Sequence, residues 1–343
     1  MTFRQLGSGR GEPILEAGLP IIDAHHHLFN RPALRYMFDD YLADVHSGHS
    51  IIASVYVETH AMARVDGPEM LRPLGEIEFA NGVGAMASSG LYGACRVCAA
   101  IVGYADLRYG DAIGDYLDQA LLLAPDRLRG IRQVTIDDSS EAAYQFISVR
   151  PPRGILQHPN FRKGFRQLAP RKLSFDAAVF HHQLPEIVAL ADAFPDTAII
   201  LNHAGHTMCL GLNNSEREQI FGVWGRHMRE LALRPNVVCK IGGLGLPFWG
   251  FGLERRPDTI GYLELARLWK PYVETVIEAF GAPRCMMESD YPPDSRSCGF
   301  VPLWNALKYI VHSASTAEKA ALFHGTAARI YRIELPQTPK APG

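Results

Sequence analysis

The sequence contains few cysteines and no long apolar run. Its six cysteines are scattered over 343 residues, which fits a reducing compartment better than a disulfide framework. Cys95 and Cys98 form a CxxC with no second pair at zinc-site spacing, and we interpret them as buried thiols. No stretch approaches the roughly 20 apolar residues of a membrane span, and the N-terminal MTFRQLGSGRGEP lacks the apolar core of a secretory signal. We therefore expect a cytoplasmic protein with no membrane partner.

The chain also lacks an excess of charge of either sign. Its formal net charge is −2, which argues against nucleic acid or an anionic membrane surface as the main partner. Hydrophobic residues make up 47% of the chain and charged residues 20%, which is typical of a globular protein that can bury a sizeable core. No linker rich in proline, glycine and serine divides the sequence, so we expect a single domain.

Short apolar runs recur along the chain, and most are followed by a helical pattern. The eight predicted strands are residues 20–28, 51–58, 95–107, 128–136, 173–180, 197–204, 236–244 and 284–292. Between them, apolar residues recur three and four positions apart, as in amphipathic helices. Examples of these helical segments are residues 110–124, 184–194, 217–233 and 259–280. Eight near-continuous apolar strands alternating with helices indicate an α/β fold, a (β/α)8 TIM barrel rather than an open sheet.

We expect the barrel to span residues 19–335, with an N-terminal extension at 1–18 and a flexible, proline-rich tail at 336–343. Three connections that follow strands are longer than ordinary loops. These excursions are residues 29–50, 137–160 and 205–215. In a barrel, all three would lie at the carboxyl ends of the strands, where active sites form.

Several of the 14 histidines stand at the ends of predicted strands. In the stretch IIDAHHHLFN, strand alternation places His25 and His27 on one face and His26, with Asp23, on the other. Further polar clusters end the fifth, sixth and eighth strands: FHHQ at 180–183, NHAGH at 202–206 and ESDYP at 288–292. Imidazole nitrogens with one carboxylate oxygen are the usual ligands of a catalytic zinc. The pattern predicts a metal or catalytic site at this end of the barrel.

Together these motifs resemble the amidohydrolase superfamily. The closer resemblance is to its amidohydrolase-related branch (amidohydrolase 2), which includes sugar-lactone and pyrone-dicarboxylate lactonases. The elements that carry it are D-x-H-x-H, HHQL, NHAG and ESDYP, together with GIRQ at 130–133, KIGGLG at 240–245 and GTAARIYRI at 325–333. The resemblance extends from Leu19 to Ile333 and implies an enzyme that acts on a small molecule.

The resemblance also implies a ligand set for one divalent cation, zinc. His25 and His27 match the metal-binding pair of the first strand, and His181 matches the histidine of the fifth strand, with His182 as the alternative. Asp290 matches a residue that is both a ligand and the general base. Some lactonases of this branch work without metal, so metal-free operation stays open.

For catalysis, the resemblance assigns Asp290 and His203, the latter acting on the water or the substrate. Further substrate contacts are expected from residues on the same rim: Arg132, Glu58, His60, Trp249 and Tyr291. Arg132 is suited either to a substrate carboxylate or to an internal ion pair. The two aromatic residues are suited either to the pocket wall or to the core.

The reaction that we expect is the opening of a lactone or similar cyclic ester by water, with Asp290 taking the proton of the water. The alternative is a metal-dependent, non-oxidative decarboxylase of an aromatic or muconate-type acid, because such enzymes share the superfamily and a similar residue set. Barrels of this type commonly pair through outer helices, so a homo-oligomer is also expected.

Overall fold

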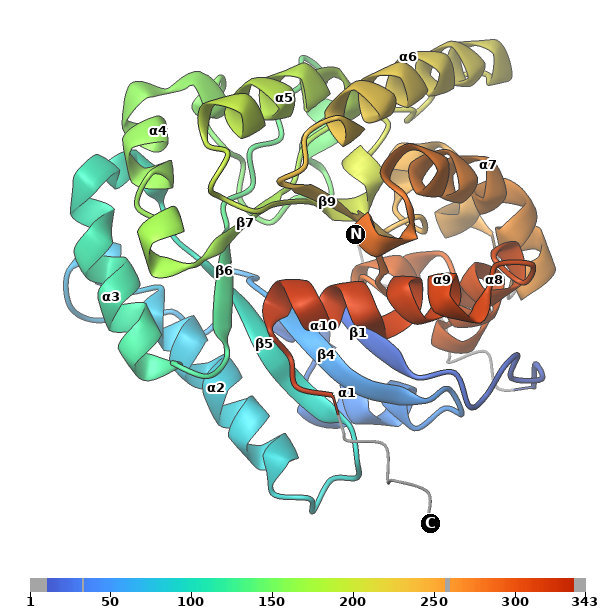
Figure 1. Ribbon diagram of the computed structural model, residues 1–343, viewed down its shortest axis with the longest axis horizontal. Helices are drawn as coiled ribbons and strands as arrows, with labels where there is room; N and C mark the ends of the chain where they lie inside the picture. Colours follow the sequence, from blue (N-terminus) through green and yellow to red (C-terminus); the bar gives the residue numbers. More distant parts are fainter. Residues whose placement is uncertain (1–10, 33, 257–259, 336–343) are drawn as a thin grey trace.

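The structure is a computed structural model that describes residues 11–32, 34–256 and 260–335 (Figure 1). Eight parallel strands follow one another in the order β1-β4-β5-β6-β7-β8-β9-β10. Their bounds are β1 Ile21–His26, β4 Ile51–Val57, β5 Arg96–Tyr104, β6 Leu128–Arg132, β7 Ser174–Ala177, β8 Ile199–Leu201, β9 Val237–Ile241 and β10 Cys285–Met287. A separate antiparallel hairpin, β2 (Phe29–Arg31) and β3 (Leu34–Tyr36), follows β1.

The sheet closes between its first strand and the segment after its last. The backbone N–H of Asp290 donates to the His25 carbonyl at 2.9 Å, and that of His27 donates to the Tyr291 carbonyl at 2.8 Å. A parallel bridge joins His26 to Tyr291. The predicted (β/α)8 barrel is therefore confirmed.

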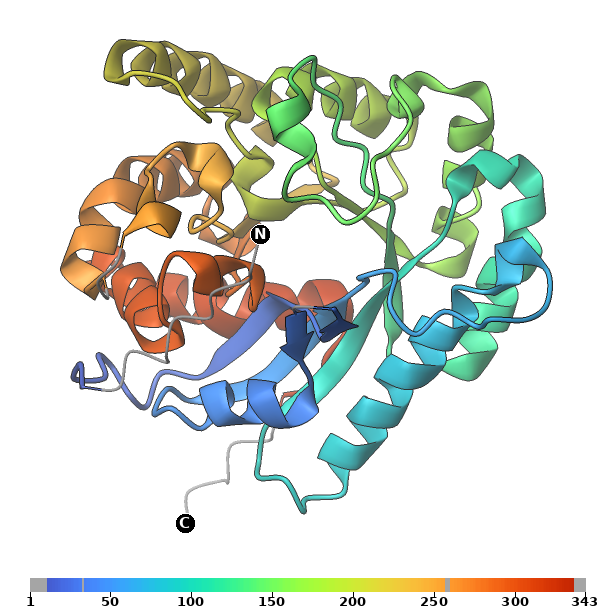
Figure 2. The same ribbon diagram turned by 180° about the vertical axis from the view of Figure 1, so that it is seen from behind.

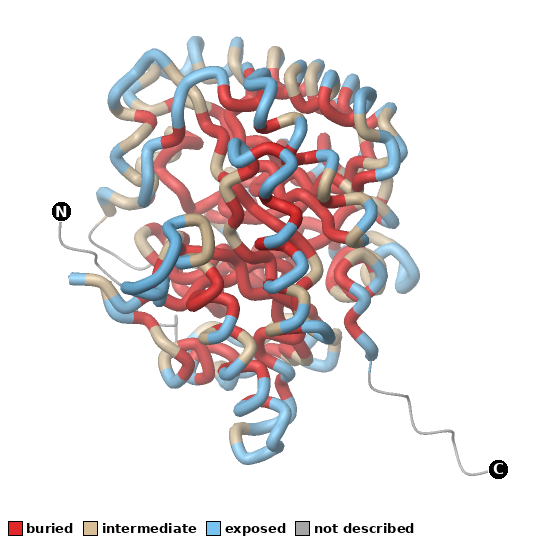
Figure 3. The backbone as a smooth tube through the Cα atoms, turned by 90° about the vertical axis from the view of Figure 1, so that its left-hand side faces the viewer, coloured by how far each residue is buried: buried red, intermediate tan, exposed pale blue. Residues whose placement is uncertain are grey.

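Helices surround the barrel, as the two opposite views show (Figures 1 and 2). Their bounds are α1 Phe38–Val45, α2 Leu74–Ser88, α3 Ile113–Leu123, α4 Pro159–Phe165, α5 Leu184–Ala193, α6 Asn214–Ala232, α7 Tyr262–Phe280, α8 Phe300–Ile310, α9 Thr316–Ala320 and α10 Thr326–Tyr331. In α7, Leu265, Trp269 and Val273 recur every four residues and are all buried against the barrel. The burial pattern is the one expected for such layers, with a buried centre and exposed outer helix faces (Figure 3). No described helix is long and apolar enough to cross a membrane.

Every barrel strand is shorter than predicted, and several of the lost residues carry the chemistry. For example, the runs predicted to end at residues 107, 204 and 292 leave the sheet after Tyr104, Leu201 and Met287. Just beyond the last two of these ends, His203 and Asp290 adopt left-handed backbone conformations with φ near 50°, outside the region of regular β-strands. The polar strand ends are therefore turns that hold side chains over the barrel.

The long connections contain defined structure. Residues 29–50 hold the β2–β3 hairpin and α1, whereas 137–160 is built mostly of short 3₁₀ turns and loop before α4. Of the predicted N-terminal extension, the described part packs against α8, where Lys308 Nζ donates to the carbonyls of Leu15 and Glu16 at 2.9 Å. The predicted tail at 336–343 lies outside the described residues.

Candidate active site

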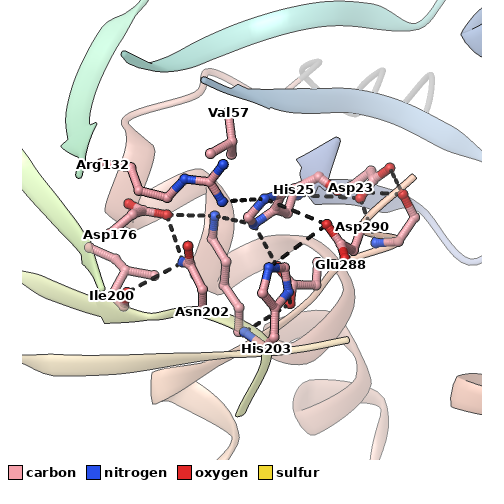
Figure 4. Close-up of polar contacts among 12 residues, drawn as sticks. Asp23, His25, Val57, Arg132, Asp176, Ile200, Asn202, His203, Glu288 and Asp290 are labelled. Carbon is pink, nitrogen blue, oxygen red and sulfur yellow. Dashed lines mark hydrogen bonds and ion pairs between the residues drawn. The ribbon is translucent and has the colours of Figure 1, made fainter. Parts of the chain in front are cut away.

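The Nε2 atoms of three histidines, His25, His27 and His203, lie close to Asp290, and the Nδ1 atom of each lies near another acceptor. Figure 4 shows His25 and His203 beside Asp290 and Glu288. His27 Nδ1 lies 2.8 Å from the Val57 carbonyl. His203 Nδ1 lies 2.7 Å from Glu288 Oε1, and His25 Nδ1 lies 3.0 Å from Glu288 Oε2. Carbonyl and carboxylate oxygens accept hydrogen bonds, so each Nδ1 carries a hydrogen, and Nε2 keeps a lone pair wherever the ring is neutral.

Asp290 lies where these lone pairs converge. Its Oδ1 is 3.4 Å from His27 Nε2 and 3.8 Å from the Nε2 atoms of both His25 and His203. The side chain is buried, and its Oδ2 has no hydrogen-bond partner in the described part of the chain. The left-handed backbone at Asp290 is a strained conformation that surrounding structure must hold. One oxygen thus faces the imidazoles and the other remains free.

This donor set fits a divalent cation. The Nε2 atoms of His25 and His27 are 3.1 Å apart, a distance at which two lone pairs repel unless a cation lies between them. Ligand atoms of a tetrahedral zinc with Zn–N bonds near 2.0 Å are separated by roughly 3.3 Å. His25, His203 and Asp290 each offer a ligand atom within 4.8 Å of the others. His25 and Asp290 can therefore share one ion with a third side chain, either His203 or His27, whose Nε2 lies 3.4 Å from Asp290 Oδ1.

Glu288 is a site residue that the sequence analysis missed. It is fully buried: its Oε1 accepts from His203 Nδ1 at 2.7 Å, and its Oε2 lies 3.0 Å from His25 Nδ1. Gly242 of the KIGGLG motif leaves room for it, since a Cβ there would lie 2.3 Å from Glu288 Cγ. Alternation along a strand places Glu288 on the same face as Asp290, as it places His25 on the same face as His27. This spacing could have identified Glu288 from the sequence.

The imidazoles differ in their electrostatics. Burial lowers the pKa of His25 well below its usual value, and Lys240 and His203 add to the effect. Burial also lowers the pKa of His27. Burial alone would lower the pKa of His203 as well, but the Asp290 and Glu288 carboxylates outweigh it and raise that pKa. Lys240 Nζ lies 3.4 Å from His25 Nδ1 but pairs with Asp176 Oδ2 at 2.7 Å.

Arg132 forms an internal ion pair, one of the two roles open for it. Its Nε donates to Glu58 Oε1 at 2.7 Å and its Nη2 to the Glu58 carbonyl at 2.8 Å. Its Nη1 lies 3.2 Å from His25 Nε2, consistent with a lone pair there. Burial alone would raise the pKa of Glu58, but Arg132 and His60 lower it. His60 Nε2 lies 3.4 Å from Glu58 Oε2.

A cavity opens above these groups, with a polar base and an apolar wall. The base consists of His27, Glu58, His60, Arg132, His203, His206 and Asp290. The wall consists of Phe29, Val134, Ile136, Phe146, Ile147, Val149, Ala178, Leu246 and Phe248, and Ser148 and Pro293 complete the lining. The structure thus brings Glu58, His60 and Arg132 to the cavity, as the sequence predicts.

His181 is not brought to the site. It lies in a 3₁₀ turn, residues His181–Gln183, and is not among the residues that line the cavity. Its Nδ1 accepts from the Met208 N–H at 3.3 Å, and burial lowers its pKa to about 4. The alternative, His182, lies 2.7 Å through Nε2 from the Asp137 carbonyl outside the cavity. The wall position near the end of the fifth barrel strand is taken by Ala178.

Trp249 and Tyr291 do not line the cavity either. Trp249 is fully buried, donates from Nε1 to the Gly243 carbonyl at 2.8 Å and packs on Tyr272 at 4.9 Å between ring centroids. The Tyr291 hydroxyl donates to the Cys298 carbonyl at 2.7 Å. Both belong to the core, the second role open for them, and Phe248 supplies the aromatic wall instead.

The chain is similar in sequence and in fold to known proteins. A family model described as amidohydrolase matches residues 22–333. An uncharacterized protein of Sinorhizobium fredii is 34% identical over 298 residues, covering 87% of this chain and 86% of that protein. The L-fucono-1,5-lactonase of Burkholderia multivorans is 27% identical over 240 residues, covering 69% of this chain and 73% of that enzyme. The crystal structure of a Burkholderia multivorans amidohydrolase with bound zinc has the same fold, with a TM-score of 0.69 at 24% identity over 92% of this chain and 99% of that one.

Proposed function

This chain belongs to the amidohydrolase family, and we propose that it opens a lactone or a similar cyclic ester by attack of water. The observation that carries the proposal is the convergence of three imidazole Nε2 atoms and one carboxylate beneath the cavity. The likeness to L-fucono-1,5-lactonase supports the reaction class.

We propose His25, His27 and Asp290 Oδ1 as the groups that hold a single divalent cation, zinc. The zinc in the Burkholderia structure of the same fold supports this choice. When bound, zinc polarises a carbonyl and lowers the pKa of water to about 7.

The chain itself moves the protons. Asp290 Oδ2, free of hydrogen bonds within the described residues, takes a proton from the attacking water and returns it to the leaving alkoxide. His203 lines the cavity, and its raised pKa favours the doubly protonated ring, which donates from Nε2 to the developing oxyanion. Glu288 acts through others: it fixes the rings of His25 and His203.

A decarboxylase at the same site is less well supported. A carboxylate substrate needs a cationic partner beyond the metal site. Among the described residues that line the cavity, Arg132 is the single lysine or arginine, and Glu58 occupies its Nε and Nη2.

The direction of the pH change during turnover tests the proposal. Lactone opening releases a proton near pH 6, whereas decarboxylation with loss of CO2 consumes one. In weak buffer with an indicator dye and a CO2-free purge, we expect acidification with lactones and none with Asp290→Asn. Alkalinisation with aromatic acids would contradict the proposal.

A further inference from the structure

The apolar wall of the cavity is a packed unit. Phe146, from the long loop before α4, meets Phe248, from the loop after β9, edge to face at 5.6 Å between ring centroids. Val134 and Ile136 line the same cavity from the segment after β6. Residues distant in sequence thus form one apolar surface opposite the polar base.

This wall offers little to a substrate rich in hydroxyl groups. Its one side-chain hydroxyl, that of Ser148, already accepts from Arg31 Nη1 at 2.7 Å. A substrate hydroxyl placed against it would give up its hydrogen bonds to water without gaining a partner, which is unfavourable. On the base, the guanidinium of Arg132 and the carboxylate of Glu58 are paired with each other.

His206 stands between the base and the wall. Its ring lies 4.7 Å from His203 and 5.5 Å from Phe248 between centroids. It is 3% exposed and lines the cavity. Neither ring nitrogen has a hydrogen-bond partner of normal geometry among the described residues. A buried imidazole without partners is unfavourable unless a ligand supplies them.

The environment of His206 suits an uncharged partner. Burial lowers the pKa of His206 well below its usual value, and the neighbouring His203 and Arg132 lower it further. A neutral imidazole offers one donor and one acceptor, which matches an ester oxygen or a water held beside it.

From these contacts we infer that the site takes a cyclic ester bearing an apolar alkyl or aryl substituent. The substituent packs against Val134, Ile136 and the Phe146–Phe248 pair, and His206 holds an uncharged oxygen of the ester. This inference rests on the proposed function, whose substrate class it names.

The first experiment compares kcat/KM for δ-valerolactone, δ-hexalactone and δ-nonalactone with that for D-glucono-1,5-lactone. Each additional buried methylene is expected to raise kcat/KM about fourfold until the wall is covered. Faster turnover of the gluconolactone than of δ-nonalactone would overturn the inference while leaving lactone hydrolysis intact.

Variants of the wall test its role. Val134→Thr/Ile136→Thr places two hydroxyl groups on the wall, with the side-chain shape kept at position 134 and one carbon lost at position 136. It should reduce the ratio of kcat/KM for δ-nonalactone to that for δ-valerolactone by threefold or more. Val188→Thr, on α5 and away from the cavity, should leave the ratio unchanged. An equal ratio in the wall variant and the parent overturns the inference.

A binding measurement separates this inference from the reaction itself. Calorimetry on the zinc-loaded protein compares 6-pentylpiperidin-2-one with D-glucono-1,5-lactam, two ring amides that do not require turnover. Tighter binding of the pentyl lactam supports the inference even if no lactone is opened, in which case only the proposed function fails. Tighter binding of the sugar lactam, or no binding of either, overturns it.

His206 is tested by His206→Leu. The variant should raise KM for δ-nonalactone at least tenfold with kcat changed less than threefold, since the residue positions the ester. An unchanged KM in a variant with the parent melting temperature removes His206 from the assignment.

Discussion

At the scale of single residues, Glu288 sets the orientation of the His25 and His203 rings. One carboxylate lies against the Nδ1 atoms of both His25 and His203, so it fixes the orientation of both rings. Partners of this kind orient metal-binding imidazoles and raise their basicity. His25 can thus present Nε2 to a cation while His203 keeps the hydrogen on Nδ1.

Glu288→Gln should weaken zinc binding 10- to 100-fold, because an amide can accept from only one of the two rings with its single oxygen. Competition with a chromogenic chelator measures the affinity. Glu278→Gln, exposed on α7, is the matched control. Equal zinc affinity in Glu288→Gln and the control would show that the carboxylate has no such role.

His27 and His203 should separate metal binding from catalysis. We expect His27→Gln to lose zinc during dialysis, because it removes a proposed ligand 3.4 Å from Asp290 Oδ1. His203→Gln should retain zinc and lose 100-fold or more in kcat, the range of a proton-transfer group. Metal analysis and steady-state kinetics check both. Loss of zinc in both variants would make His203 a ligand.

At the scale of secondary-structure elements, the close approach of the ends of β9 and β10 requires a glycine at position 242. A Cβ at Gly242 would lie 2.3 Å from Glu288 Cγ and 2.4 Å from its carbonyl oxygen. Two strand ends therefore approach more closely than any side chain at position 242 allows, and this approach fixes where Glu288 points.

Gly242→Ala should lower the free energy of unfolding by about 1 to 3 kcal/mol, as overpacking does, and weaken zinc binding. Gly222→Ala is the control. It is exposed in the middle of α6, where a Cβ meets only Arg226 Nη1 at 3.9 Å, and it should stabilise by about 0.5 to 1 kcal/mol. Urea denaturation measures both; a stable Gly242→Ala with full zinc affinity would contradict the steric argument.

The elements also show what the sequence can and cannot predict. Apolar runs and helical periodicity predict all eight strands and the helices α3, α5, α6 and α7, because those patterns are local. The turns after β7, β8 and β10 depend on tertiary contacts, such as the hydrogen bond from Asp290 N to the His25 carbonyl. The position of the motif therefore suggests His181 as a site residue, but His181 does not line the cavity. His206, in the turn after β8, lines it instead.

At the scale of the whole molecule, a buried carboxyl group connects stability to pH. Glu76 on α2 accepts at Oε1 from the Tyr56 hydroxyl and from the Thr59 N–H and hydroxyl. Burial, reinforced by Glu58, raises its pKa from 4.5 to about 7. The folded protein therefore binds a proton there more tightly than the unfolded chain does.

The tighter proton binding by the folded protein stabilises it at low pH. The stabilisation is fully present below about pH 4.5 and is lost as the pH rises through about 7. Glu76→Gln should remove this part of the pH dependence, on the order of 1 to 3 kcal/mol between pH 4.5 and 7.5. Urea denaturation at the two pH values measures it, with exposed Glu218→Gln as control. A Glu76→Gln curve parallel to the parent curve would contradict the expectation.

The closure of the barrel has a consequence for the order of events during synthesis. His25 and His27 leave the ribosome early, whereas Asp290 and the hydrogen bonds that join it to the first strand come more than two hundred residues later. A nascent chain that ends before Asp290 lacks one member of the proposed ligand set. On that proposal, a metal ion can be bound by the full set only after β10 has been synthesised and has joined β1.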